Sequence, residues 1–483
     1  MNRPATPSPP ASLGERMALA FCVGAIALAL WSAVCATPRL DWNAARLMPA
    51  FVLAGGGKIY FPPGEGPALG WIYGPVMPAV MTPAALLPTI TSAMLAAACI
   101  NAAFLLTPLL VGVNFLARGA GFAGRERAWL VVLCAGAALA VPWIANSLVF
   151  ITADNVVVGL ALWSCLCLAS SGSDGRGAWF AALLAALAVW TKQLAIGVPA
   201  AQLLWLAWSG GLRVAVRHAG RLLAAGVLVA AVCVAVFGWE ELRFNLWTVP
   251  SHHPLKGGAE FWFGQLGALA MACLPCVVLF AILRRSAAAP NPAASLVAAV
   301  ALAQLPLGAL GASKIGGGEN SFHAIYYFAA AAGLQLAASG GAAQAWLRQR
   351  WMVLACVASL GGLVVVSNQT NWRLTPAVQL EASRALAADH PGEILFPRNP
   401  LVTWWTERKI YHLEYGYFDQ ALAGFPPTPA RLASGLPAHV RYVVYQDDGV
   451  DHPFVRLLPG FERAVRGPGF VIHVAAPPAP RNQ

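Results

Sequence analysis

Residues 16–36 have the sequence RMALAFCVGAIALALWSAVCA, in which Arg16 is the one charged residue. An α-helix needs about 20 apolar residues to cross the hydrocarbon core of a bilayer. This run has that length, and it is longer than the apolar core of a cleaved signal peptide. It therefore predicts a first transmembrane helix that stays in the protein, although Ala33-Val34-Cys35 resembles a processing site.

Similar apolar runs recur along most of the chain. The sequence is 58% hydrophobic and 11% charged, whereas a soluble domain has roughly 25% charged residues. We therefore predict a polytopic α-helical membrane protein with about 11 transmembrane helices. The expected spans are 16–36, 91–116, 128–149, 154–170, 178–192, 194–209, 222–239, 264–283, 294–311, 322–339 and 351–367.

The polar gaps between these runs alternate in composition. Every second gap contains arginine and no lysine, and loops that stay in the cytoplasm are enriched in basic residues. These gaps predict the inner face and place the N-terminus inside. The other gaps predict the outer face, and an odd number of spans then places the C-terminus outside. They contain four of the five lysines: Lys58, Lys192, Lys256 and Lys314.

The net charge of +11 does not indicate a nucleic-acid partner. Much of the excess lies in the arginine gaps, where it sets topology and contacts anionic lipid headgroups. Membrane lipids are therefore the expected partners of these arginines.

Composition also predicts the domain organisation. Residues 1–15 are rich in Pro, Ala and Ser and predict a disordered inner tail. Residues 16–367 form the transmembrane domain, with a long first external loop at 37–74. Residues 376–475 predict a small external α/β domain, because charged residues become frequent and the long apolar runs stop. Residues 476–483 predict a frayed tail.

Local patterns add detail to these segments. In the first external loop, 42–54 predicts a helix lying on the membrane surface, and the prolines of 75–89 predict a short kinked helix. In the α/β domain, runs rich in Val, Ile, Tyr and Phe predict strands. The strands are expected at 393–396, 441–446 and 470–475, and helices at 376–389, 400–408 and 429–436.

The lysine gaps contain the candidate functional residues. Ionisable groups near the ends of membrane spans are costly and are functional hypotheses by default. Their expected position at the outer interface favours chemistry on lipid headgroups over transport through the bilayer. The candidates are Asp41, Lys58, Asp154, Lys192, Arg243, His252, His253, Lys314, Glu319 and Asn320.

Each acid has a structural alternative. Asp41 follows the first span, where a carboxylate can accept a proton from an acceptor hydroxyl, but it can equally cap the helix expected at 42–54. Asp154 lies at the start of the fourth span, where it can cap a helix and position a ligand at once. The ammonium of Lys192 interrupts an apolar hairpin and needs a phosphate or carboxylate partner.

The remaining candidates suit an anion better than a metal. Side chains of adjacent residues diverge in an extended chain, so His252 and His253 are expected to contact a phosphate or to lie on the surface rather than to chelate one ion. The glycines of 316–320 let backbone N–H groups approach an anion. No strand precedes this turn and no Lys-Ser/Thr follows it, which excludes an ATP-binding loop.

This pattern of loops resembles the membrane-embedded C class of glycosyltransferases. The features that carry the resemblance are an acid just after span one, an acid in the second outer loop, a lysine in the third, a basic His-bearing fourth and an external α/β tail. The group most similar in these features contains the protein O-mannosyltransferases and the lipid A aminoarabinose transferases. The resemblance covers most of the chain as architecture and rests on short motifs.

The resemblance implies an inverting glycosyltransferase of the bacterial inner membrane. Such an enzyme moves a sugar from a polyprenyl-phosphate carrier to a glycan, lipid or protein acceptor at the external, periplasmic face, as in building lipopolysaccharide and other parts of the cell envelope. Asp41 matches the presumed base, and Asp154 matches the second-loop acid. The residues that match the positions holding the carrier phosphate are Lys58, Lys192, Arg243 and His252 or His253.

One departure bears on the substrate and the cofactor. Relatives in the mannosyl branch often have a second acid next to the first, whereas Trp42 follows Asp41 here. A clamp of Lys, Arg and His can stabilise the leaving phosphate without a metal, so no cofactor is required. Asp41, Asp154 and Glu319 leave a bound Mg²⁺ or Mn²⁺ open as an alternative.

Three other functions fit parts of the pattern, one of them a non-catalytic assembly or scaffold protein. A transporter or flippase of lipid-linked sugar needs polar residues at the middle of its spans, and these runs are nearly free of charge there. A polymerase or ligase of surface polysaccharide also uses lipid-linked donors, with arginines in large external loops.

Overall fold

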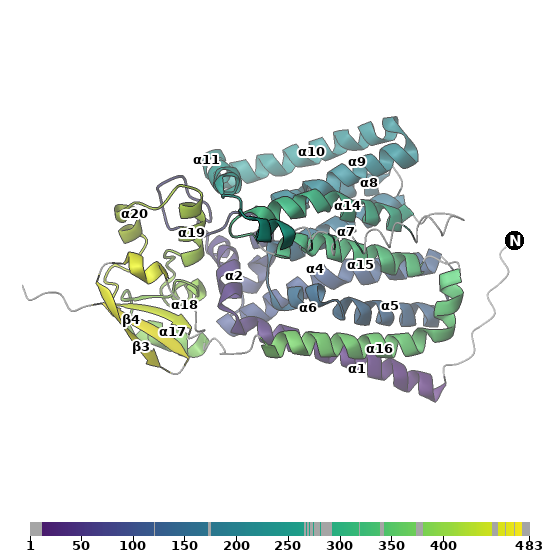
Figure 1. Ribbon diagram of the computed structural model, residues 1–483, viewed down its shortest axis with the longest axis horizontal. Coiled ribbons are helices and arrows are strands. Elements are labelled where there is room, and N and C mark those ends of the chain that lie inside the picture. The colour runs from purple at the N-terminus through teal and green to yellow at the C-terminus, as the bar shows by residue number, and fades with distance from the viewer. Residues whose placement is uncertain are drawn as a thin grey trace, which may run out of the picture.

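The computed structural model describes residues 12–475, except for most of 265–291 and for 120, 172–174, 318, 339–341, 373–379, 447–452, 459 and 468. The described chain is mostly helical and forms an elongated bundle with a smaller lobe at one end (Figure 1). We call residues 380–475 the lobe, and the end of the bundle that touches it the lobe end.

Six helices in the described residues are long and apolar enough to cross a membrane. They are α1 (Leu13–Ala36), α4 (Ile90–Gly119), α7 (Ala153–Ser171), α10 (Leu212–Phe237), α14 (Pro292–Ser313) and α16 (Ala342–Trp372). A bent pair, α5 (Gly124–Leu139) and α6 (Pro142–Val149), makes a seventh span if counted as one, with an angle of 80° between the two helices. Pro142 opens α6, where its missing N–H costs no hydrogen bond.

Three shorter apolar helices among the described residues also belong to the bundle: α8 (Arg176–Val189), α9 (Gly197–Gly210) and α15 (His323–Ala338). Every predicted span except 264–283 overlaps one of these helices, and 264–283 lies outside the described residues. The mostly helical fold with six or seven apolar spans is consistent with the predicted polytopic membrane protein, while the count of eleven spans and the topology stay predictions.

Short elements cover the lobe end of the bundle. The helix predicted at 42–54 is α2 (Asp41–Ala54), which lies between the bundle and the lobe (Figure 1). The kinked helix expected near 75–89 is α3 (Val76–Ala85). The other short elements are the 3-10 turns η1 (Thr37–Arg39), η2 (Gln193–Ile196) and η4 (Glu319–Phe322), the helices α11 (Trp239–Arg243) and α12 (Val249–His252), and the π-helical turn η3 (Phe244–Thr248).

The lobe is built on a four-stranded sheet with strand order β1-β2-β4-β3. Its strands are β1 (Ile394–Leu395), β2 (Tyr442–Gln446), β3 (Phe461–Gly467) and β4 (Phe470–Ala475). Strand β1 pairs with β2 in parallel, and the other pairs are antiparallel. The helical elements are α17 (Leu380–Asp389), α18 (Pro400–Glu407), α19 (Glu414–Leu422), α20 (Pro429–Ser434) and the 3-10 turn η5 (Pro453–Leu457).

Three elements of the lobe were not predicted: strand β3, helix α19 and the 3-10 turn η5. Strand β3 has the sequence FERAVRG, and its charges conceal the strand pattern although they suit a sheet edge, where they discourage pairing with other chains. Helix α19 has the sequence EYGYFDQAL, whose glycine and aromatic residues have low helix propensity.

The first loop and the lobe cross with their backbones in direct contact. Leu413 N donates to Ala68 O at 3.0 Å, and Ala68 N donates to His412 Nδ1 at 2.9 Å. A Cβ added at Gly416 would lie 2.3 Å from both Ala68 O and Gly70 N, so only glycine fits at this crossing. The lobe is thereby fixed against α2 and the loop that follows it.

Polar groups inside the bundle are mostly neutral and bonded to one another. Asn155 Nδ2 donates to Asn101 Oδ1 at 2.6 Å and to Ser147 O at 2.9 Å. Asn43 Nδ2 donates to Thr37 O and to Val149 O, both at 2.9 Å. We call Asn43, Asn101, Ser147 and Asn155 the neutral network. It joins α2, α4, α6 and α7, as buried amides and hydroxyls commonly do between membrane helices.

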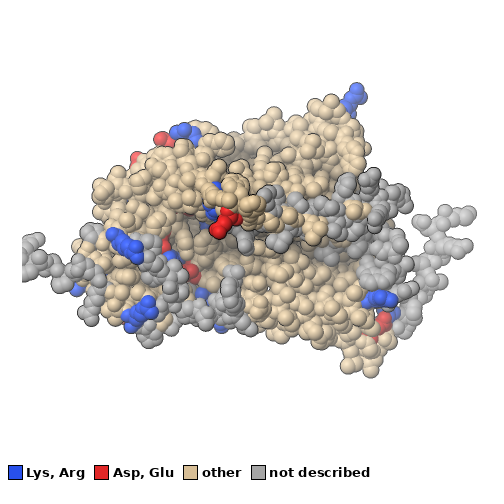
Figure 2. All heavy atoms as spheres, viewed as in Figure 1, with Lys and Arg blue, Asp and Glu red and all other residues tan. Residues whose placement is uncertain are grey.

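Charged side chains are distributed differently. On the face seen in Figure 2 they lie near the ends of the molecule and around the boundary between bundle and lobe, and the described surface between is uncharged. The site therefore has to be sought at the lobe end.

Candidate active site

A buried ion pair marks the centre of the lobe end. Lys192 Nζ lies 2.7 Å from Asp154 Oδ1, and the side chains are 8% and 14% exposed. Burial disfavours the ammonium form of Lys192, but the charge and hydrogen bond of Asp154 outweigh it and raise the pKa of Lys192 above its usual value. The Lys192 ammonium also lies 5.2 Å from the ring centroid of Tyr73, which adds a cation–π contact.

The backbone around Lys192 explains how this pair is held. Lys192 lies in the break between α8 and η2, and Gly74 N donates to Thr191 O at 3.0 Å. A Cβ at Gly74 would lie 1.6 Å from Trp190 O, so the first loop meets the lysine gap at a position where only glycine fits. Gln193 Nε2 then donates to Ile72 O and Leu246 O, at 3.1 and 2.7 Å. Three gaps of the sequence therefore converge beside Lys192.

Arg46 connects the ion pair to the lobe. Its guanidinium carbon lies 4.1 Å from the Trp42 ring centroid and 5.4 Å from that of Tyr73. Its positive charge acts on both Lys192 and Asp419 of α19. A planar guanidinium stacked on aromatic rings is well suited to bind phosphate or carboxylate.

The lobe contributes a carboxyl group with an unusual affinity for protons. Burial raises the pKa of Asp419 to about 6, although the charge of Arg46 opposes this. His253 Nε2 donates to Asp419 O at 3.0 Å and lies 4.0 Å from Asp419 Oδ1. Burial lowers the pKa of His253, the Asp419 carbonyl opposes this, and the charge of Lys314 lowers it further.

These contacts define one continuous cluster, which we call the charged junction. It contains Arg46, Tyr73, Asp154, Lys192, His253, Lys314 and Asp419. Lys314 Nζ bonds to Pro250 O, and burial lowers the pKa of Lys314. Shifted ionisable groups of both signs, gathered between two structural units, are typical of functional sites.

His323 borders the charged junction and the neutral network. Ser147 Oγ donates its one hydrogen to Trp143 O at 2.8 Å, so it accepts from His323 Nδ1–H at 3.0 Å. His323 Nε2 is then an unprotonated acceptor, buried and without a hydrogen-bond partner. The charges of Asp154 and Lys192 both act on this imidazole.

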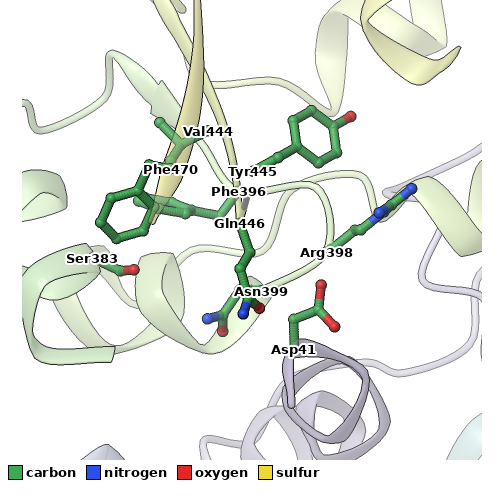
Figure 3. Close-up of a pocket in the computed structure, with 9 residues that line it drawn as sticks. All are labelled: Asp41, Ser383, Phe396, Arg398, Asn399, Val444, Tyr445, Gln446 and Phe470. Carbon is green, nitrogen blue, oxygen red and sulfur yellow. The ribbon is translucent and has the colours of Figure 1, made fainter. Parts of the chain in front are cut away.

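Asp41 lies at the start of α2 and faces the lobe. Its Oδ1 accepts from Trp42 N at 2.6 Å, and its carboxylate points toward Arg398 (Figure 3). Arg398 Nη2 in turn lies 2.8 Å from Glu414 Oε1. Asp41, Arg398, Asn399 and Gln446 line a cavity of about 10 Å³, which is room for about one water molecule.

The structure brings together only part of the predicted site. Asp154, Lys192, His253 and Lys314 belong to the charged junction. Lys58, Arg243, His252 and Asn320 are exposed, and the Glu319 side chain lies outside the described residues. His252 lies against Phe425, with ring centroids 5.5 Å apart, and its Nδ1 bonds to Thr248 O at 2.8 Å.

Four residues of the site were missed: Arg46, Tyr73, His323 and Asp419. Arg46 follows Asp41 by five residues on the helix predicted at 42–54, so its proximity to the site could have been inferred from that helix. His323 lies in the same outer gap of the sequence as Lys314, so its position in that gap is the signal that could have found it. Asp419 had no signal, because only the tertiary packing of the lobe buries its carboxylate.

The described residues contain no group of three or more His, Cys, Asp or Glu side chains that could hold a metal ion. Asp154, one of the acids expected to share such an ion, is paired with the ammonium of Lys192.

A bundle of apolar helices with an irregular loop layer and an α/β lobe at one end is the fold of the membrane-embedded C class of glycosyltransferases. The chain matches the crystal structure of ArnT from Cupriavidus metallidurans bound to undecaprenyl phosphate, with a TM-score of 0.63 and 14% identity, over 97% of this chain and 100% of that chain. It matches the same protein in the apo state with a TM-score of 0.60 and 14% identity, over 96% and 100% of the two chains.

No protein-family model matches the sequence, and no curated protein matches it. The match to the ArnT structures confirms the expected resemblance, and it does so as a likeness of fold.

Proposed function

We propose that this chain is a glycosyltransferase that takes a sugar from a polyprenyl-phosphate carrier and passes it, with inversion, to an acceptor. One observation carries the proposal: the charged junction gathers cations from several loops at the end of the bundle where Asp41 begins α2. The shared fold supports it, because ArnT was crystallised with undecaprenyl phosphate. The carrier would enter from the outer leaflet, with the lobe in the periplasm and the N-terminus inside.

The reaction is a single displacement. An acceptor oxygen attacks the anomeric carbon of the donor sugar while its proton passes to the Asp41 carboxylate. The bond between the anomeric carbon and the phosphate oxygen breaks, and the lipid phosphate leaves with both bonding electrons. Arg46 and Lys192 stabilise the charge that grows on this phosphate, because preplaced cations act strongly in a buried site.

Asp154 and His323 act through their neighbours. Asp154 holds the Lys192 ammonium at 2.7 Å, so that it faces the phosphate without reorganising. His323 offers an acceptor nitrogen beside this pair.

The sugar is identified first, from the envelope of a strain lacking the gene. Mass spectrometry of its lipid and glycan extracts should show the loss of one fixed increment. That sugar on undecaprenyl phosphate then becomes the donor in an assay with the purified protein. Loss of a transport activity with no missing increment would favour the flippase alternative.

The assay tests Asp41 directly. Asp41→Asn should lower turnover about 10²- to 10⁴-fold, as expected for loss of a general base, and should leave undecaprenyl phosphate binding unchanged. Asp389→Asn is the matched control, because Asp389 is exposed at the end of α17. Normal turnover in Asp41→Asn would refute the assignment of Asp41 as the base.

A further inference from the structure

A hollow on the side of the bundle lies far from the charged junction. It has a volume of about 280 Å³, close to the lower limit of small-molecule pockets, which is about 300 Å³. Its lining is apolar and comes from two helices: Trp179, Phe180 and Leu183 of α8, and Ala224, Ala225 and Leu228 of α10. Trp179 and Phe180 are 52% and 60% exposed, so the hollow opens to the surroundings of the bundle.

Three arginines continue the same face of α10. Arg213, Arg217 and Arg221 are spaced by four residues, and Ala225 follows at the same interval. Side chains four apart lie on one face of a helix. The face therefore changes along the helix axis from positive charge to an apolar hollow, beginning at the end of α10 away from the lobe (Figure 1).

Trp179 joins the two halves of this face. The guanidinium carbon of Arg221 lies 6.0 Å from the Trp179 ring centroid, so a positive charge is held at the rim of the hollow. Tryptophan prefers the interface between hydrocarbon and headgroups. Along this face the arginines come first, then the Trp179 indole, then the apolar hollow. A membrane lipid has its charged headgroup, its interfacial region and its acyl chain in the same order.

Helix α10 lies at the edge of the bundle, where lipid can reach it (Figure 1), and only 17% of its apolar stretch is buried. We propose that this surface is a binding site for an anionic glycerophospholipid. Its phosphate lies among Arg213, Arg217 and Arg221, and one acyl chain lies in the hollow. Basic pockets on membrane helices bind anionic headgroups in this way.

The occupant is a lipid of the leaflet opposite the reaction. A carrier phosphate bound here would lie at the far end of the bundle from Asp41 and Lys192. The site is therefore separate from the proposed glycosyl transfer, and either proposal can fail without the other.

Native mass spectrometry of the purified, delipidated protein tests the site, with phosphatidylglycerol as the probe. The R217Q/R221Q variant should bind it about thirtyfold more weakly, because each basic residue near a membrane surface contributes about a fivefold factor. Ala224→Trp should also weaken binding, by filling the hollow with the arginines unchanged. Both variants should keep the elution profile and the transfer activity of the wild type.

The controls separate this site from general charge attraction. Arg118→Gln removes an exposed arginine at the end of α4 and should leave binding unchanged. Phosphatidylcholine with the same acyl chains should bind weakly to all variants. Equal losses in Arg118→Gln and R217Q/R221Q, full binding in Ala224→Trp, or stronger binding of undecaprenyl phosphate at this site would each overturn the proposal.

Discussion

Asp154 and Asn155 are neighbours in the first turn of α7, yet they belong to two different buried regions. Asn155 belongs to the neutral network, where amides donate to carbonyl oxygens and to one another. Asp154 belongs to the charged junction, where an acid and a base are held together out of water. The first turn of α7 therefore contributes one residue to the neutral network and one to the charged junction.

The two regions show that buried neutral groups and buried charges have different energetic costs in a highly apolar chain. A buried amide that keeps its hydrogen bonds fastens helices at little cost. A buried charge is costly even when paired, and burying it adds little to stability. Charges retained in that setting are better explained by a ligand than by the fold. The predictions below test this contrast, from the largest expected effect to the smallest.

Lys192→Met should destabilise the protein most. It leaves the Asp154 carboxylate buried without its partner, which typically costs about 3–5 kcal/mol. The D154N/K192M double variant should recover much of this loss, because no buried charge remains. Apparent melting temperatures of the purified variants measure the effect, with the exposed Lys409→Met as control.

The double variant should bind undecaprenyl phosphate as poorly as Lys192→Met. Recovery of stability without recovery of binding would separate the two roles of Lys192. Equal stability of Lys192→Met and the wild type would mean that this ion pair is not buried in solution.

Asp419→Asn should change the pH dependence of stability. The pKa of Asp419 is raised to about 6 in the folded protein, so the wild type loses stability as the pH rises from about 4 to 6 and stays at the lower level above 6. The cost at pH 7 is on the order of 3 kcal/mol. At that pH Asp419→Asn should therefore be the more stable protein, and near pH 4 the two should be alike.

The measurement is the melting temperature of both proteins across this range. Arg46 and His253 face Asp419, and the titrations of His253 and Asp419 are coupled because His253 Nε2 lies 4.0 Å from Asp419 Oδ1. The comparison is therefore repeated in a His253→Asn background, in which that imidazole does not titrate. A difference that stays constant between pH 4 and pH 7 would show that Asp419 does not titrate there.

His323→Asn tests the border between the two regions. The asparagine amide can replace the imidazole Nδ1–H that bonds to Ser147, but it removes the Nε2 acceptor. We expect an unchanged melting temperature and a loss of about three- to tenfold in kcat/KM, the worth of one neutral hydrogen bond. A large loss of stability with normal turnover of the folded fraction would assign His323 to the neutral network alone.

Asn155→Ala should have the smallest effect on turnover. It removes the amide donor that reaches Asn101, Ser147 and Phe150, and polar contacts between membrane helices average about 0.6 kcal/mol each. The apparent melting temperature should fall, and kcat/KM should stay within twofold of the wild type. A larger fall in kcat/KM than in stability would contradict the division between the two regions.

The helices of the bundle could be predicted because a long apolar segment in a membrane must satisfy its backbone hydrogen bonds internally, and an α-helix does so within one segment. The helix at 42–54 was also predictable, since its apolar positions recur with a helical spacing. Strand β3 and helix α19 were not, because tertiary packing overrides their local preferences.

Site residues could be predicted only where an ionisable residue lies in an outer polar gap of the sequence, as Asp154 and Lys192 do. Their pairing could not be derived, because it depends on how α7 and the break after α8 pack together. Exposed Lys58 and Arg243 show the limit of that reasoning, since a basic residue in an outer gap need not face the site. Asp419 shows the converse. The pKa of its carboxyl group is raised only because the folded lobe buries it, and the sequence gives no sign of this burial.

The crossing of Gly70 and Gly416 has a consequence for biosynthesis. The two glycines lie about 350 residues apart, so a ribosome adding about 5–20 residues per second needs roughly 20–70 s to make the second after the first. During that time the lobe that packs against α2 and the following loop has not yet been made. The charged junction includes Asp419 of the lobe, so it can form only when translation is nearly finished, and a chain truncated before the lobe lacks it.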